Sequence, residues 1–367
     1  MSSGVNPEML VLARESRGLS QQELAESVFV TQGKVSKYEN GMLSVSEDDL
    51  EAIARVLNYT QEFFVQRDRV YGLGSSFLFH RQRKQVPMHL QRKIQAEINI
   101  LRMQVERLLR GVEIATENRF HAIDIDGCDD DVAKVARLTR ASWNLPLGPV
   151  ANVTAAIESA GGIVLKCSFG TNLIDAAHLW LPGLPPLFFV NRDQPGDRLR
   201  WTLAHEVGHA VMHRNPTGDV EEQASRFANE FLMPTDEIGN QLDGLTLRQA
   251  AVLKQQWKVS MAAVVKWAYM LGRISEYKYR NLNVSLSAQG YKVIEPFPID
   301  VEEPQVVRQI VEVHRTSLGY NEFDLAKLLY SPDAQFFAPA QDVKVFKFDN
   351  RPFFAFFPER GPRRSFG

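Results

Sequence analysis

The chain is poor in cysteine and has no dominant charge. Only two cysteines, Cys128 and Cys167, occur among its 367 residues, and they are not spaced as Cys-x-x-Cys. We therefore expect two free thiols in a reducing compartment. The formal net charge is -2, so the composition gives no global sign of nucleic-acid binding. Any basic surface for such a partner has to be local.

Long apolar runs are also missing. No stretch approaches the 18 or so apolar residues of a membrane span, and the N-terminus lacks a basic-then-apolar leader. We therefore expect a cytoplasmic protein with no membrane partner. The chain is 44% hydrophobic and 23% charged, which is ordinary for globular proteins, and its length allows two or three domains.

The most informative stretch is the His-Glu-x-x-His pattern at residues 205–209. Residues four apart lie on one face of a helix, so His205 and His209 can bind one metal ion. Glu206 lies beside them, where it can hold and deprotonate a metal-bound water, as in zinc peptidases. Zinc lowers the pKa of its bound water toward about 7. The alternative is two surface histidines on an amphipathic helix.

A catalytic zinc needs a third protein ligand. His213 lies roughly 12 Å from His205 along a helix axis, too far to share the ion, so we expect a packing or supporting role. Glu221 begins a second predicted helix and shares the face of its apolar stripe, where a carboxylate needs a partner such as a metal. The alternative for Glu221 is a first-turn acid that favours the helix dipole, equivalent to Glu222.

Two sequence blocks carry a family resemblance. Residues 202–213, followed by Glu-x-x-Ala-x-x-Phe-Ala and Leu-Met-Pro, resemble the ImmA/IrrE family of zinc-dependent metallopeptidases. The resemblance implies one zinc per chain, with Glu206 as the catalytic base. It implies the ligands His205, His209 and Glu221. A set of two histidines and one glutamate also suits manganese or another divalent transition metal.

One position departs from the family pattern. Family members often carry Asn or Asp four residues after the third ligand, where it braces a metal-bound histidine. This chain has Ser225 there. Because such partners orient ligands and tune affinity, the substitution predicts weaker support for the metal.

Residues 1–66 predict a compact bundle of four helices. Residues 19–25 and 30–41 resemble the Xre/Cro-type helix-turn-helix family, which implies double-stranded DNA as a partner. A recognition helix needs short polar and basic residues near its N-terminus. Glutamine can read adenine, lysine can reach guanine or phosphate, and Gln21 suits a backbone phosphate. The candidate DNA-binding residues are Gln21, Gln32, Lys34, Ser36 and Lys37. The alternative is a bundle used for protein contacts.

Residues 67–120 predict a basic linker with one long helix. Its apolar residues alternate by four and three, as in a short coiled coil. These seam residues are Ile94, Ile98, Leu101, Val105, Leu108 and Val112. We slightly favour a homodimer here over docking on the peptidase domain. The basic residues either extend the phosphate contacts or form a solvated helix face.

Residues 121–290 predict an α+β, zincin-like metallopeptidase domain with a small sheet and a following helical segment that resembles a second helix-turn-helix. Strands are expected at 163–167, 178–181 and 187–190. Residues 178–181 are our candidate edge strand for holding a substrate backbone. His178 is a possible transition-state stabiliser, and the alternative is a surface histidine.

Residues 291–367 form a C-terminal region of unknown role. Helices are expected at 306–317 and 322–329 and a β-hairpin at 343–357. The whole chain therefore predicts a mostly helical α+β protein.

Three functions remain open from the sequence. The resemblance implies a regulatory metalloendopeptidase that cleaves a helix-turn-helix repressor to control stress or mobile-element genes. The alternative is an Xre-family regulator whose peptidase-like domain senses a metal, a ligand or a protein without catalysis. A third possibility is an antitoxin-like DNA binder whose hairpin tail holds a partner.

Overall fold

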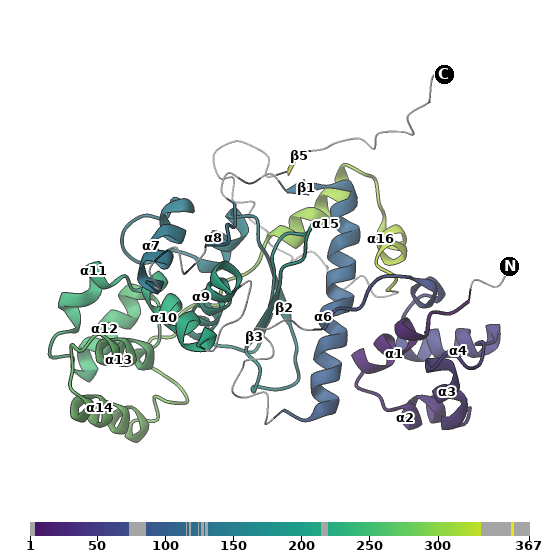
Figure 1. Ribbon diagram of the computed structural model, residues 1–367, viewed down its shortest axis with the longest axis horizontal. Coiled ribbons are helices and arrows are strands. Elements are labelled where there is room, and N and C mark those ends of the chain that lie inside the picture. Colours follow the sequence, from purple (N-terminus) through teal and green to yellow (C-terminus); the bar gives the residue numbers. More distant parts are fainter. Residues whose placement is uncertain are drawn as a thin grey trace, which may run out of the picture. The chain divides into compact units, whose positions relative to one another are not determined.

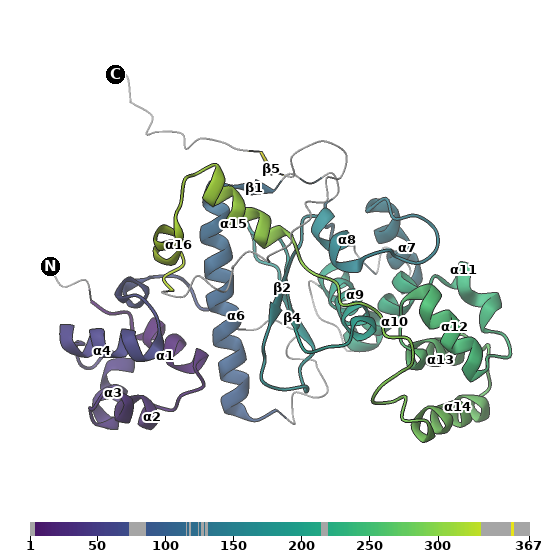
Figure 2. The same ribbon diagram turned by 180° about the vertical axis from the view of Figure 1, so that it is seen from behind.

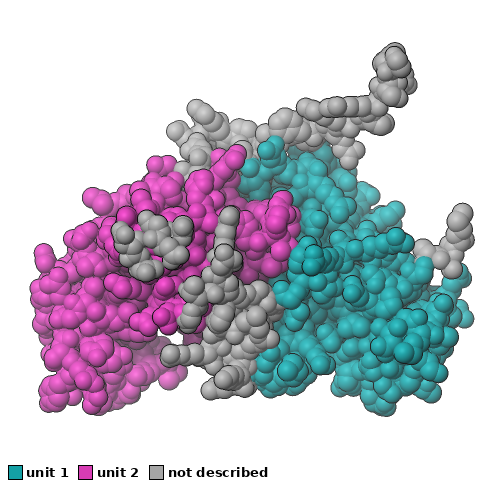
Figure 3. Space-filling view, viewed as in Figure 1, with its two compact units in different colours: residues 1–73, 84–115, 306–367 teal, residues 74–83, 116–305 magenta. Residues whose placement is uncertain are grey.

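The chain forms two compact units (Figure 3). The computed structural model describes residues 4–72, 86–114, 116, 119–123, 125, 128, 131–213, 219–331 and 354–355. Unit 1 contains residues 1–73, 84–115 and 306–367, and unit 2 contains residues 74–83 and 116–305. Most of unit 2 is therefore inserted into the sequence of unit 1.

The secondary structure confirms the mostly helical α+β class. The structure is 58% helical and contains a small three-stranded sheet. Among the helices described, none is long and apolar enough to cross a membrane.

The N-terminal part of unit 1 is the predicted bundle of four helices (Figure 1). These are α1 (Pro7–Ser16), α2 (Gln21–Ser27), α3 (Gln32–Glu39) and α4 (Glu47–Leu57). Ser20 and Glu23 form a capping box at the start of α2, and Thr31 caps α3. These caps satisfy backbone N–H groups that have no partner within the helix. The bundle closes over buried side chains that include Met9, Leu24, Val35, Ile53, Leu57 and Phe64.

Unit 1 also contains the long helix α6 (Met88–Leu108) and two C-terminal helices, α15 (Val306–Thr316) and α16 (Glu322–Leu328). Helix α6 packs against α1, α15 and α16. Nε2 of His314 donates to the carbonyl oxygen of Leu108 at 2.8 Å, and Nε2 of Gln104 donates to that of Leu329 at 3.2 Å. The C-terminal helices predicted from the sequence are therefore confirmed, and they belong to the same unit as the helix-turn-helix.

The apolar seam of α6 is not an open face. Its five side chains on α6, together with Val112 just after the helix, are only 0–6% exposed: Ile94, Ile98, Leu101, Val105, Leu108 and Val112. The seam is thus already covered within a single chain. Strand β1 (Glu113–Ile114) pairs antiparallel with β5 (Phe354–Ala355). The rest of the predicted hairpin at 343–357 lies outside the described residues.

The sheet of unit 2 has the order β2-β4-β3. Its strands are β2 (Ile163–Cys167), β3 (Ala176–Leu179) and β4 (Leu187–Asn191). Figure 2 shows β2 and β4 side by side. β2 runs parallel to β4, whereas β3 runs antiparallel to it and lies at one edge. The predicted edge position is confirmed, but the strand begins and ends two residues earlier than the predicted 178–181. Cys128 and Cys167 are buried and are not joined in a disulfide, as expected.

Helices α8 (Val153–Ser159) and α9 (Gly196–Met212) pack against this sheet, and further helices complete the described part of unit 2. The further helices are α7 (Val132–Ser142), α10 (Val220–Leu232), α11 (Thr235–Ile238), α12 (Leu247–Trp257), α13 (Met261–Met270) and α14 (Glu276–Ala288). Helix α9 packs against α10 and against β3 and β4. Gly208 allows the close crossing of α9 and α10, because a Cβ there would lie 3.0 Å from Cδ1 of Phe227. This crossing brings Glu221 on α10 to the two histidines on α9.

Candidate functional site

Three candidate ligands converge where α9 meets α10. Nε2 of His209 lies 3.1 Å from Nε2 of His205 and 3.2 Å from Oε1 of Glu221. Nε2 of His205 lies 3.6 Å from Oε2 of Glu221. Two ligands about 2.1 Å from a tetrahedral ion are roughly 3.4 Å apart. The three separations therefore fit donors around one metal ion, and these residues form the metal-type cluster found among the described residues.

The charge states of these groups also suit a divalent cation. Burial lowers the pKa of His209, which favours the neutral imidazole that binds metals. Burial raises the pKa of Glu221, but hydrogen bonds with His205 and His209 outweigh it and hold this pKa well below its usual range. The site therefore offers neutral nitrogen donors and an ionised carboxylate. That donor set fits zinc and other divalent transition metals.

Glu206 lies beside the cluster and is fully buried, with 0% exposure. Its Oε2 atom lies 2.7 Å from Nδ1 of His178, which comes from the edge strand β3. The His178 side chain is only 13% exposed, so the interpretation as a surface histidine is wrong. The structure brings His178 to the candidate base.

His213 contacts a candidate ligand and is not a member of the cluster. Its Nδ1 atom lies 2.9 Å from Nδ1 of His209, and its Nε2 atom lies 2.8 Å from Oε1 of Gln223. This position agrees with the packing or supporting role expected from the helix geometry, and the role itself stays a prediction. At the other histidine, Oγ of Ser225 lies 3.5 Å from Nδ1 of His205, at the outer limit of a hydrogen bond.

Three further residues near the site were not predicted from the sequence: Gln223, Trp201 and Asn229. The Trp201 ring stacks on His205, with centroids 5.2 Å apart and an interplanar angle of 25°. Its Nε1 atom donates to Oδ1 of Asn229 at 2.9 Å. Trp201 comes four residues before His205, so the helical spacing alone could have identified it.

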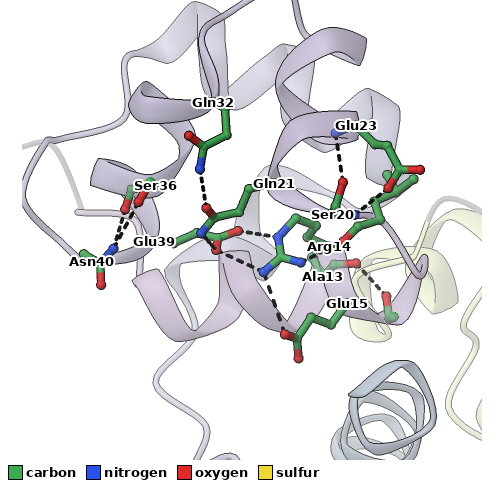
Figure 4. Close-up of polar contacts among 12 residues, drawn as sticks. Ala13, Arg14, Glu15, Ser20, Gln21, Glu23, Gln32, Ser36, Glu39 and Asn40 are labelled. Carbon is green, nitrogen blue, oxygen red and sulfur yellow. Dashed lines mark hydrogen bonds and ion pairs between the residues drawn. The ribbon is translucent and has the colours of Figure 1, made fainter. Parts of the chain in front are cut away.

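In the helix-turn-helix, a polar network leads from the core to the start of α3 (Figure 4). Nε of Arg14 lies 2.6 Å from Oε1 of Glu39, a pair that is largely buried. Nε2 of Gln21 donates to Oε2 of Glu39 at 2.8 Å, and Nε2 of Gln32 donates to Oε1 of Gln21 at 2.7 Å. The network therefore orients the exposed amide of Gln32 through Gln21.

The other candidate DNA-binding residues differ in their surroundings. Lys37 is exposed and Ser36 is half-buried on α3. Lys34, by contrast, pairs with Asp49, with Nζ 2.7 Å from Oδ2. Burial opposes ionisation of Asp49, but hydrogen bonds with Lys34, Tyr38 and Ser46 lower the pKa of Asp49 from 3.8 to about 2. Lys34 thus stabilises the bundle in this structure, whereas Gln32 and Lys37 present their side chains to solvent.

Comparison with known protein families separates two domains along the chain. A peptidase-family model, described as the IrrE N-terminal-like domain, matches residues 157–268, which contain the whole candidate metal centre. A model described as helix-turn-helix matches residues 10–63. No curated protein matches the chain.

These matches define the class of protein. The chain joins a helix-turn-helix domain of the kind found in DNA-binding regulators to a peptidase-like domain. More particularly, it is a fusion of an Xre-type helix-turn-helix with an IrrE N-terminal-like domain.

Proposed function

We propose that this protein is a DNA-binding regulatory zinc metalloendopeptidase. The observation that carries the proposal is the convergence of three candidate ligands, His205, His209 and Glu221, within 4.8 Å of one another. Glu206 adjoins them in the sequence and is buried at the same site. A structural metal site would need no buried carboxylate beside its ligands, whereas peptide hydrolysis needs a base there.

The residues divide the work of hydrolysis as follows. A bound zinc ion would supply a Lewis acid for the peptide carbonyl and a water of lowered pKa. The Glu206 carboxylate takes a proton from the attacking water and passes it to the leaving amine nitrogen. His178 holds Oε2 of Glu206. The edge strand β3 carries His178 and offers backbone groups for an extended substrate.

The proposed substrate is a helix-turn-helix repressor, whose cleavage in the cytoplasm would release stress or mobile-element genes. The family resemblance supports this substrate class. The helix-turn-helix domain adds a physical reason, because binding double-stranded DNA close to a repressor raises the local concentration of the peptidase. Gln32, Lys37, Ser36 and Gln21 would contact that DNA, with Lys34 contributing only if its pair with Asp49 opens.

The fusion of a helix-turn-helix domain to the peptidase-like domain favours a second function. A protease acting on a separate repressor does not require its own DNA-binding domain. The peptidase-like domain would then sense a metal, a ligand or a protein and alter DNA binding without catalysis. A homodimer would suit paired half-sites in the operator, but the covered seam of α6 removes the coiled-coil argument for one.

Substitution Glu206→Gln separates the two functions. It keeps the size of the side chain and removes the base, so a protease should lose its regulatory effect while metal and DNA binding persist. New protein N-termini would be compared by mass spectrometry in cells producing the wild type, Glu206→Gln or the exposed control Glu222→Gln. A repressor fragment present with the wild type and the control, but absent with Glu206→Gln, supports proteolysis. Unchanged regulation without a fragment establishes the sensor.

A further inference from the structure

A chain of hydrogen bonds links the candidate ligand His209 to α10, the helix that carries the candidate ligand Glu221. It begins at His209 on α9, passes through His213 and ends at Gln223 on α10. The two contacts measure 2.9 and 2.8 Å. His213 is 8% exposed, so water competes little for its ring nitrogens.

The position of the ligand cluster fixes the direction of these hydrogen bonds. His209 presents Nε2 to His205 and Glu221. A nitrogen that binds a metal carries no proton, so the proton of a neutral His209 has to lie on Nδ1. Nδ1–H then donates to Nδ1 of His213. The proton of His213 consequently lies on Nε2 and is donated to the side-chain oxygen of Gln223.

We propose that His213 and Gln223 are positioning residues that fix the tautomer and ring orientation of His209 and thereby strengthen metal binding. This inference rests on the proposed metal site. Partners of this kind contribute substantially to the affinity of metal centres. We call the hydrogen-bonded residues His209, His213 and Gln223 the relay. Gln223 follows the ligand Glu221 by two residues, so one turn of α10 provides both a ligand and the last residue of the relay.

The relay also bears on Ser225, which stands where family members often carry Asn or Asp to brace a histidine ligand. The Ser225 hydroxyl reaches His205 only at 3.5 Å, whereas both contacts of the His209 relay are shorter than 3.0 Å. Support for the two ligand histidines is therefore unequal. His209 is held by the shorter contacts. Removing the Ser225 side chain should therefore reduce zinc affinity less than removing that of Gln223.

Substitutions at Gln223 test the relay because the side chain is only partly buried. Gln223→Leu keeps the approximate volume and removes the acceptor, so zinc affinity should fall by about 10–100-fold. Gln223→Glu keeps an acceptor oxygen and should retain or increase the affinity. Glu222→Leu, an exposed change in the same turn, is the matched control and should leave it unchanged. His213→Phe keeps a ring without an acceptor and should lose at least as much as Gln223→Leu.

The measurement is zinc affinity of the full chain by competition with a chromogenic chelator, together with thermal unfolding of the metal-free proteins by circular dichroism. Weaker binding in Gln223→Leu and His213→Phe, with rescue in Gln223→Glu, supports the relay. Wild-type affinity in Gln223→Leu, or equal losses in Gln223→Leu and Gln223→Glu, overturns the relay but leaves the metal site standing. No zinc binding by the wild type overturns the metal site itself and the relay with it.

Discussion

Nδ1 of His178 lies 2.7 Å from Oε2 of Glu206, although the two residues are 28 positions apart. The contact joins the edge strand β3 to helix α9 at a carboxylate that is inaccessible to solvent. The His178 ring also lies nearly parallel to that of His209, with centroids 6.1 Å apart. The candidate base is therefore held by the sheet as well as by its own helix.

Replacing His178 should impair Glu206 while leaving the ligand set intact. His178→Leu removes a hydrogen bond to a buried carboxylate, which costs about 1.5–3 kcal/mol of unfolding free energy. It should also lower the turnover of a cleaved substrate by about 10–100-fold, without loss of bound metal. His178→Asn places an amide N–H close to the position of Nδ1. It should restore most of the unfolding free energy and most of the turnover. Urea unfolding, metal content and single-turnover cleavage provide the three readouts. Loss of metal in His178→Leu would show that His178 acts on the ligands instead.

A buried ion pair at the other end of α9 should contribute strongly to the stability of unit 2. Glu302 pairs with Arg200 on α9 and accepts hydrogen bonds from the backbone N–H groups of Val153 and Thr154 at the start of α8. Glu302→Gln leaves the buried guanidinium without its counter-charge, which should cost about 3–5 kcal/mol.

The neighbouring residue Glu303 provides the control for that experiment. Its carboxylate is half exposed and pairs with Lys166 at 2.6 Å. Glu303→Gln should change the unfolding free energy by only about 0–1 kcal/mol. Denaturant titrations of both variants would be compared at the same pH. Similar effects of the two substitutions would contradict a special role for the Arg200 pair.

The polar network at the start of α3 makes a prediction about DNA binding. Gln32→Ala removes the amide that Gln21 orients, so it should reduce discrimination between operator and non-operator DNA by about 1–3 kcal/mol. Gln22→Ala is the control on α2, since the exposed Gln22 side chain donates to Glu26 in the next turn of the same helix. Fluorescence anisotropy with specific and random duplexes at fixed salt measures the difference. An equal loss on both duplexes would assign Gln32 to backbone contact instead of base recognition.

The parts of the site that could be predicted from sequence all depend on helical periodicity. His205 and His209 had to share a face because they lie four residues apart, and Glu221 had to share the face of Ala224. The same geometry separated His213 from the ligands. The caps at Ser20 and Thr31 likewise follow from local chemistry, because their side chains accept backbone hydrogen bonds three residues further on.

The features that could not be predicted depend on contacts between distant segments. Periodicity contains no information about which strand meets Glu206, so His178 remained ambiguous. The pairing of Lys34 with Asp49 follows from the packing of α3 near α4. Lys34 is therefore engaged within the bundle, although the sequence alone indicated a residue available for DNA. The return of α15 and α16 to α6 joins segments about 200 residues apart. For this reason the α6 seam resembled a dimer interface when the sequence was read alone.

The most direct test of the proposed metal centre is the metal content of the full chain purified without chelators. Elemental analysis would compare the wild type with His205→Ala and Glu221→Ala, each checked for folding by circular dichroism. We predict about one zinc, or another divalent transition metal, per wild-type chain and its loss in both variants. A wild-type protein that contains no metal, and takes up none when zinc is added back, would contradict this prediction and leave a DNA-binding regulator with an inactive peptidase fold.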